Sequence, residues 1–296
     1  MKRICSVLLK AFTYIRGFFT KSADFCETLL CFAESGFYRT KVDYEKKPYI
    51  NLIVNGPSVN SVKHLFGLDS KFTERPSIVV NFFANTPEYE IVRPEYYTLA
   101  DPMFFQDTPG KSVEKVKKFY KTLNDRTKWP LTIFIPKSYG KKKFYEYSLI
   151  DNDNINVVEI NGIGYDGFEA IRNWSYKHGF CAPRAYTVAI MALYACVQMG
   201  FQQIDIYGLD NNYYASLSLT NEGVVCDVMQ HNGEPDEYRK ILDGKGNPVT
   251  LHDYLLGITY HLKNHEIMNE YAKYRGAIIF NHSPITMVDA YPRKLD

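Results

Sequence analysis

The chain has 296 residues, of which 46% are hydrophobic and 23% charged, and this composition excludes a disordered or collagen-like protein. Its formal net charge of +2 gives no electrostatic support for nucleic-acid binding, which needs a basic stripe. The length suffices for one large or two modest hydrophobic cores. The aromatic share of 15% suits stacking on flat ligands and a well-filled core equally.

The cysteines favour a reducing compartment, because none of them forms a C-x-x-C pair and most stand in apolar surroundings. They are Cys5, Cys26, Cys31, Cys181, Cys196 and Cys226. His and Cys do not cluster at the spacings typical of zinc sites, and the Asp151 and Asp153 pair is typical of a turn. We therefore expect a cytoplasmic protein without a metal cofactor.

The first forty residues are predicted to form a basic amphipathic helix. Every charge up to residue 21 is positive, and apolar residues recur at helical spacing. Those apolar residues are Ile4, Val7, Leu8, Phe12, Ile15, Phe18 and Phe19. Two interpretations stay open: residues 1–21 contact an anionic membrane surface peripherally, or the helix packs on the protein's own surface. The pattern is too interrupted to span a bilayer, and it is a poor secretory signal.

Strands and helices alternate from residue 41 onward. We expect strands at residues 50–54, 77–83, 131–135, 203–207 and 277–280, with a further strand starting at 97–100. We expect helices at 59–68, 111–123, 185–199 and 251–274. This alternation predicts an α/β protein with a Rossmann-like, doubly wound, mostly parallel sheet. Residues 41–296 are predicted to be one domain, with residues 1–40 as an N-terminal appendage.

The first strand runs into an Asn-Gly-Pro-Ser turn, which is typical of a phosphate-binding loop in an α/β fold. Gly56 is expected to supply a backbone conformation closed to other residues, and Ser58 to cap the following helix. The alternative is an ordinary turn, since no G-x-G-x-x-G is present.

Small or polar residues stand at the carboxyl ends of four of the predicted strands, and a doubly wound sheet brings such strand ends to one edge. They are Asn55, Gly56, Pro57 and Ser58 after the first strand, Asn81, Asp101, and Gly208, Leu209 and Asp210. Ligands of open α/β sheets bind at this edge, so these residues predict a nucleotide site.

These motifs, in this order and at this spacing, resemble bacterial sialyltransferases. The turn at 55–58, Asn81, the Asp-Pro-x-Phe-Phe element at 101–105 and the apolar helix leading to the Gly-Leu-Asp element at 208–210 carry the resemblance. It covers roughly residues 49–290. The family is that of the Campylobacter-type lipooligosaccharide sialyltransferases, together with related surface-polysaccharide glycosyltransferases. It implies a single GT-A-like nucleotide-binding domain, with an acceptor lid around residues 211–250.

The resemblance also implies roles for individual residues. Asn55, Gly56 and Ser58 would approach the donor phosphate and sugar, Asn81 the nucleotide and Asp210 the ribose. Tyr213 and Tyr214 resemble paired tyrosines that hydrogen-bond the leaving phosphate. The family has Asn where this chain has Asp101. A carboxylate there repels a sialic acid carboxylate unless it is protonated or turned away.

Transfer from a CMP-sugar expels a phosphate anion, which hydroxyls, backbone N–H groups and a helix N-terminus stabilise without a metal. Thr187 and Arg184, near the start of the apolar helix, are placed for this role, although Arg184 is equally typical of a solvated charge. The acceptor hydroxyl needs a base, for which histidine is the natural residue. His231 and His252 lie where the family has its base, and His282 also follows a strand end. His261 and His265 are more typical of a solvated or packed pair.

The sequence thus predicts a metal-independent inverting glycosyltransferase, namely a sialyltransferase that uses CMP-sialic acid and the sugar hydroxyl of a bacterial surface glycan. Its expected partners are the nucleotide-sugar donor, the glycan acceptor, the inner face of the cell membrane and a second copy of the chain, with no nucleic acid. Three alternatives stay open: another nucleotide sugar as donor, which Asp101 favours; a pyrophosphokinase-like enzyme; and a non-catalytic glycan-binding or assembly protein.

Overall fold

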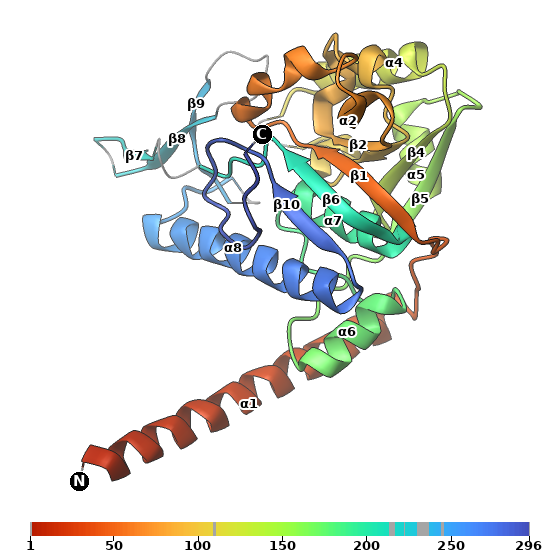
Figure 1. Cartoon of the computed structure of the whole chain (residues 1–296). Coiled ribbons are helices and arrows are strands. Elements are labelled where there is room, and N and C mark those ends of the chain that lie inside the picture. Colours follow the sequence, from red (N-terminus) through yellow and green to blue (C-terminus); the bar gives the residue numbers. More distant parts are fainter. Residues whose placement is uncertain are drawn as a thin grey trace.

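A computed structural model of the chain describes residues 2–108, 111–212, 217–221, 223–229, 237–243 and 246–295. Its centre is a parallel seven-stranded sheet with the strand order β10-β6-β1-β2-β3-β4-β5 (Figure 1). The strands are β1 (Lys47–Ile53), β2 (Ser77–Val80), β3 (Tyr96–Thr98), β4 (Leu131–Pro136), β5 (Ile155–Ile160), β6 (Phe201–Tyr207) and β10 (Ile278–Asn281). The predicted α/β architecture with a parallel sheet is therefore confirmed.

Helices cover both faces of this sheet and so bury its strands on both sides. The helices are α1 (Lys2–Ser35), α2 (Ser70–Thr73), α3 (Tyr89–Val92), α4 (Val113–Arg126), α5 (Lys141–Ser148), α6 (Glu169–Lys177), α7 (Val188–Met199) and α8 (Leu251–Tyr274). Leu52 of β1 and Ile206 of β6 share one hydrophobic cluster with α7 and α8. Ile53 and Val79 face the other cluster, which includes Phe119 of α4.

The sheet is doubly wound about β1. From β1 the chain adds β2, β3, β4 and β5 in turn on one side, and then α6 and α7 carry it back to β6 on the other side of β1. The direction of winding thus reverses between β1 and β6, and in open α/β sheets ligands bind in the crevice beyond the carboxyl ends of two such strands.

Several predicted boundaries were wrong for local reasons. The helix expected at 59–68 consists of two 3-10 turns, η1 (Pro57–Ser61) and η2 (Lys63–Leu65). The second strand ends at Val80, because the chain turns into the 3-10 helix η3 (Asn81–Asn85). β5 and α6 were not predicted, and Asn156 and Glu159 interrupt the apolar pattern of β5.

The helix α1 extends well beyond the body of the molecule at its N-terminal end (Figure 1). Its second half packs on the body, where Thr28 and Phe32 are buried. Its first half is exposed from residue 13, and Tyr14 and Phe19 expose 81% and 66% of their surface. Of the two interpretations, packing on the protein's own surface therefore applies to the second half of the helix. Within the part of the chain that the structure describes, no helix is long and apolar enough to cross a membrane.

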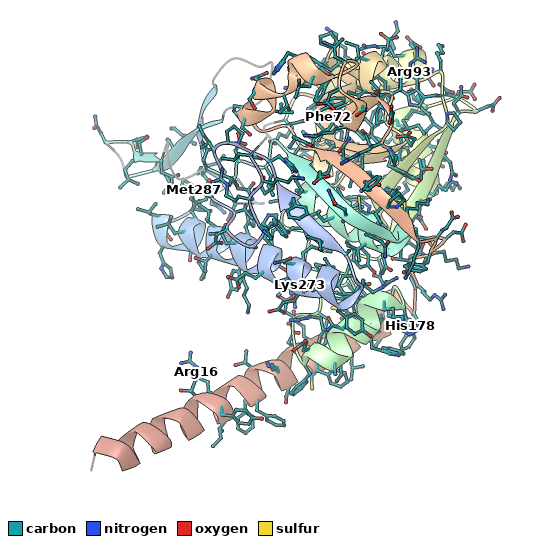
Figure 2. All side chains as sticks on the ribbon, viewed as in Figure 1. Arg16, Phe72, Arg93, His178, Lys273 and Met287 are labelled. Atoms are coloured by element: carbon teal, nitrogen blue, oxygen red, sulfur yellow. The ribbon has the colours of Figure 1, made fainter. Side chains whose placement is uncertain are left out.

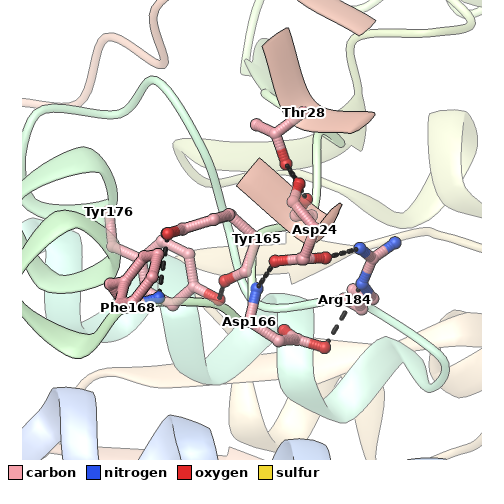
Figure 3. A network of polar contacts seen from close by, with 8 residues as sticks. Asp24, Thr28, Tyr165, Asp166, Phe168, Tyr176 and Arg184 are labelled. Carbon is pink, nitrogen blue, oxygen red and sulfur yellow. Dashed lines mark hydrogen bonds and ion pairs between the residues drawn. The ribbon is translucent and has the colours of Figure 1, made fainter. Parts of the chain in front are cut away.

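An ion-pair network fastens α1 to the loop before α7 (Figure 3). Asp24 accepts hydrogen bonds from the Arg184 guanidinium at 2.6 Å and from the backbone N–H of Asp166 at 3.0 Å. Arg184 also contacts the carboxylate of Asp166 at 3.2 Å. Two carboxylates thus hold the Arg184 guanidinium, so it is neither a solvated charge nor a clamp waiting for an anion.

The predicted lid region contains a small antiparallel sheet of its own. Its strands are β7 (Ser218–Leu219), β8 (Val225–Met229) and β9 (Glu237–Lys240), with β8 in the middle. Figure 1 shows this sheet beside the N-terminal end of α8. The division into residues 1–40 and 41–296 stays a prediction.

Candidate functional site

The turns that follow β1 and β6 pack directly against each other at the switch point. The backbone N–H of Gly56 donates to the carbonyl of Gly208 at 3.0 Å. Gly56 has an ordinary φ of −64°, so the expected special backbone conformation was wrong. Glycine is needed here for space, because a Cβ would lie 2.3 Å from the Gly208 oxygen and 2.7 Å from Cγ of Asp210. Gly208 does have a positive φ, of 80°.

Ser58 and Asp210 join the two turns across 152 residues of sequence. The Ser58 backbone N–H donates to Asp210 Oδ2 at 2.8 Å, and its hydroxyl donates to the other carboxylate oxygen. Ser58 therefore lies inside η1 and bonds Asp210, whereas the expected capping role was wrong. Asp210 is only 5% exposed. Burial raises the pKa of its carboxyl, and the two bonds from Ser58 oppose that rise.

Two asparagines lie at the ends of β1 and β2, where they meet. Asn55 Nδ2 donates to the carbonyl of Val80 at 3.2 Å. The next residue, Asn81, has a left-handed backbone with φ 51°, a conformation that Asn tolerates better than most residues. The buried side-chain oxygen of Asn81 has no hydrogen-bond partner among the described residues. Backbone strain and an unsatisfied polar atom at one residue are typical of a binding site.

Asp101, after β3, acts as a helix cap. Its carboxylate accepts a hydrogen bond from the Met103 N–H at 3.1 Å and so begins the 3-10 helix η4 (Pro102–Phe104). Pro102 follows it at the first helical position. Capping of η4 therefore explains why a carboxylate stands at this position.

The N-terminus of α7 points toward the same edge of the sheet. Thr187 is the residue before this helix, yet its side chain caps nothing, and its buried hydroxyl oxygen has no partner among the described residues. Unpaired N–H groups of a first helical turn favour anions. A cavity of about 230 Å³ lies beside this end of α7 and is lined by the carboxyl ends of β3, β4 and β5. Its wall includes Ala100, Tyr139, Asn161 and Pro183.

Two residues after β10 hold the Gly-Leu-Asp element in place. The hydroxyl of Ser283 accepts from the Leu209 N–H at 2.8 Å, and the hydroxyl of Thr286 donates to the Leu209 carbonyl at 2.6 Å. Leu209 itself is buried. Sequence reasoning missed Ser283 and Thr286. The Asn-His-Ser sequence after the last predicted strand was the available signal.

Of the candidate bases, the structure describes His252 and His282. His231 lies outside the described residues, as do Tyr213 and Tyr214. His252 is exposed in the first turn of α8, after the Thr250 cap. His282 is buried, and its Nε2 lies 2.9 Å from Asp205 Oδ1. Burial would raise the pKa of Asp205, but the hydrogen bonds from His282 and Gln203 and the nearby charges lower it.

His261 and His265 on α8 form a packed pair, which is one of the two arrangements expected from the sequence. His265 is fully buried between the Tyr291 hydroxyl, 2.9 Å from Nδ1, and the Asn211 amide, 3.2 Å from Nε2. Burial, with a smaller effect of His261, lowers the pKa of His265 to about 3. Burial also lowers the pKa of His261, whose ring contacts Tyr186 next to Thr187. Both imidazoles are neutral near pH 7.

The structure therefore brings together Asn55, Gly56, Pro57, Ser58, Gly208, Leu209 and Asp210 at the switch point, with Asn81 at the adjoining strand end. Asp101 and Thr187 lie along the same edge, beside the cavity. No protein-family model matches this chain, and no curated protein matches its sequence.

Proposed function

We propose that the chain is a glycosyltransferase that binds a nucleotide-sugar donor at the carboxyl edge of its sheet. The observation that carries the proposal is the convergence of Asn55, Ser58, Asn81 and Asp210 on the β1–β6 switch point. Open α/β sheets bind nucleotides at such a point. The two asparagines offer amide groups to a base or ribose. The buried side-chain oxygen of Asn81, which has no partner among the described residues, suits a hydrogen bond from an N–H or O–H group of the ligand.

The proposed reaction expels a nucleotide phosphate as an anion. Thr187 and the first N–H groups of α7 suit its stabilisation, because an uncommitted hydroxyl and a helix N-terminus attract negative charge without a metal. The proposed mechanism is inverting: the acceptor oxygen attacks the anomeric carbon as the bond to phosphate breaks, and a base takes the acceptor proton. We place that base in the region 211–252, at His231 or His252.

For the donor sugar we propose sialic acid, carried by CMP. The carboxylate of Asp101 argues against it, because the family has Asn there, but the hydrogen bond that Asp101 accepts from the Met103 N–H supports a carboxylate turned toward its own helix. The resemblance to GT-A-like sialyltransferases of the Campylobacter type supports the same choice. The second candidate is a different nucleotide sugar bound at the same site. It is favoured by Asp101, which stands where the family has Asn.

The proposed acceptor is a bacterial surface glycan, and the proposed location of the protein is the cytoplasmic face of the membrane. The exposed first half of α1 supports a peripheral membrane contact, since Tyr14, Ile15 and Phe19 face solvent beside Arg16. Residues 211–250, with the β7–β9 sheet, are the proposed acceptor lid. Self-association remains a further proposal.

A nucleotide screen separates these candidates. We expect CMP to raise the melting temperature of the purified protein, because a ligand that binds only the folded state stabilises it. The protein should then release CMP from CMP-sialic acid, and EDTA should leave this rate unchanged. Stabilisation by UDP without any by CMP would end the sialic acid proposal. A protein that releases no nucleotide from any sugar donor would be the non-catalytic alternative.

The base is tested by substitution. We expect His231→Ala to lower transfer by about 100-fold while CMP still stabilises the protein, since general bases contribute roughly that much. His252→Ala is compared in the same assay, and His64→Ala, exposed on η2, is the control. Full activity in the His231 variant with a loss in the His252 variant would move the base to His252. Full activity in both would exclude the two histidines.

A further inference from the structure

A second cavity, of about 600 Å³, lies at the opposite edge of the sheet from the candidate site. It lies where α6, α7 and α8 end, beside the extended segment that precedes β1. Its wall consists of Arg39, Thr40, Val42, Tyr44, Lys177, His178, Gly179, Gln198, Tyr274 and Arg275. Figure 2 shows His178 at the end of α6, on the side of the molecule where α1 joins the body.

The charge on this wall is of one sign. Arg39, Lys177 and Arg275 contribute three cationic groups, His178 adds an imidazole, and none of the wall residues carries a carboxylate. Among the described residues, none of the three cations forms an ion pair. Like charges around one concave space repel each other and focus a positive potential into it.

Helix dipoles explain only part of this arrangement. Lys177 and Arg275 stand at the C-terminal ends of α6 and α8, where cations are favourable in any protein. Arg39 belongs to no helix and still lines the same space. It therefore adds a positive charge that no helix end requires.

Arg275 is also held in a fixed position. Its Nη1 donates to Gln198 Oε1 at 3.0 Å and to the Tyr271 hydroxyl at 2.9 Å, and its guanidinium lies 4.8 Å from the centre of the Tyr44 ring. All three partners are neutral, so they orient the guanidinium without cancelling its charge. A fixed guanidinium with a second cation nearby matches the several oxygens of a phosphate group.

We propose that this cavity is a binding site for a phosphate-bearing anion. The proposal is independent of the glycosyltransferase proposal, because the two sites share no residue. Two sources offer the same chemistry: a free phosphate compound and the headgroup of an anionic lipid. Trp174, which is 54% exposed on α6 and packs against His178, supports the second, since Trp is favoured at membrane interfaces.

The test is a calorimetric titration of the full chain with pyrophosphate at fixed salt. We expect the variant with Arg39→Ala and Lys177→Ala to bind at least about ten-fold more weakly, as loss of charge-assisted hydrogen bonds predicts. Both side chains are exposed, so the fold should tolerate their truncation. The control, Lys117→Ala with Lys121→Ala, removes two equally exposed charges from α4.

Vesicle flotation distinguishes the two sources. Vesicles of phosphatidylcholine with or without phosphatidic acid are compared for the wild-type chain and both double variants. Loss of phosphatidic acid-dependent flotation in the cavity variant alone assigns the site to a headgroup, whereas a loss confined to pyrophosphate binding assigns it to a free phosphate compound. The proposal is overturned if the wild-type chain binds neither probe, or if the cavity and control variants weaken binding equally.

Discussion

At the scale of single residues, Gly56 shows how close contact, and not backbone freedom, can require a glycine. Its φ is accessible to every residue, but the turn after β6 leaves no room for a Cβ. Sequence reasoning found the correct residue for the wrong reason. The neighbour that fills the space, Gly208, is remote in sequence and meets Gly56 only because β6 is inserted beside β1.

We expect Gly56→Ala to destabilise the protein by about 1–3 kcal/mol, the usual effect of added volume in a tightly packed place. Lower midpoints in chemical denaturation would show this. Gly257→Ala is the matched control: it lies within α8 with nothing within 4 Å of its Cβ position, and Ala is the better helix former. Equal stability of the Gly56 variant and the wild-type protein would contradict the packing account.

The buried His265 predicts a pH dependence of stability. Its pKa falls from 6.5 to about 3 on folding, so the unfolded chain takes up a proton between these values and the folded protein does not. Stability from this group is complete above pH 6.5 and decreases as the pH falls toward 3, with a slope of up to about 1.4 kcal/mol per pH unit. The raised pKa values of Asp166 and Asp210 act in the opposite direction.

His265→Gln isolates this contribution, because glutamine keeps hydrogen-bonding capacity but does not titrate. We expect its unfolding free energy to depend less steeply on pH between 4 and 6.5 than that of the wild-type protein. His64→Gln, at an exposed position, should keep the wild-type slope. Parallel curves for His265→Gln and the wild-type protein would exclude a neutral buried imidazole.

Among the elements, α1 divides into two halves that differ in how they pack. The network of Asp24, Arg184 and Asp166 fastens the second half to the loop that leads into α7 and so to the edge with the candidate site. The first half stays exposed along residues 13–21. The amphipathic pattern predicted the helix, but it could not reveal which turns pack, since Asp24 meets Arg184 across 160 residues of sequence.

We expect Ile15→Ser with Phe19→Ser to reduce flotation of the protein with anionic vesicles several-fold, because both side chains are more than half exposed and apolar burial drives interfacial binding. Leu68→Ser with Leu149→Ser, at 83% and 80% exposure elsewhere, is the control. If the two double variants float alike, the first half of α1 is not the membrane contact.

At the scale of the whole molecule, the sequence predicted the sheet better than the site. Apolar runs bounded by turns identified β1, β4, β6 and β10, and the length of α8 was predicted residue for residue. Strand order was beyond prediction, since a parallel pattern does not say where β6 inserts. The bond between Ser58 and Asp210 depends on that insertion, and so do the contacts of Ser283 and Thr286.

Calorimetric titration with CMP tests whether the β1–β6 switch point binds this nucleotide. Asn81→Gly removes the amide while glycine accepts the left-handed backbone, and Asn85→Ala, exposed at the end of η3, is the control. We predict binding by the wild-type protein, equal binding by the Asn85 variant and binding at least about ten-fold weaker by the Asn81 variant. Absent CMP binding, or equal affinities in all three proteins, would contradict the account.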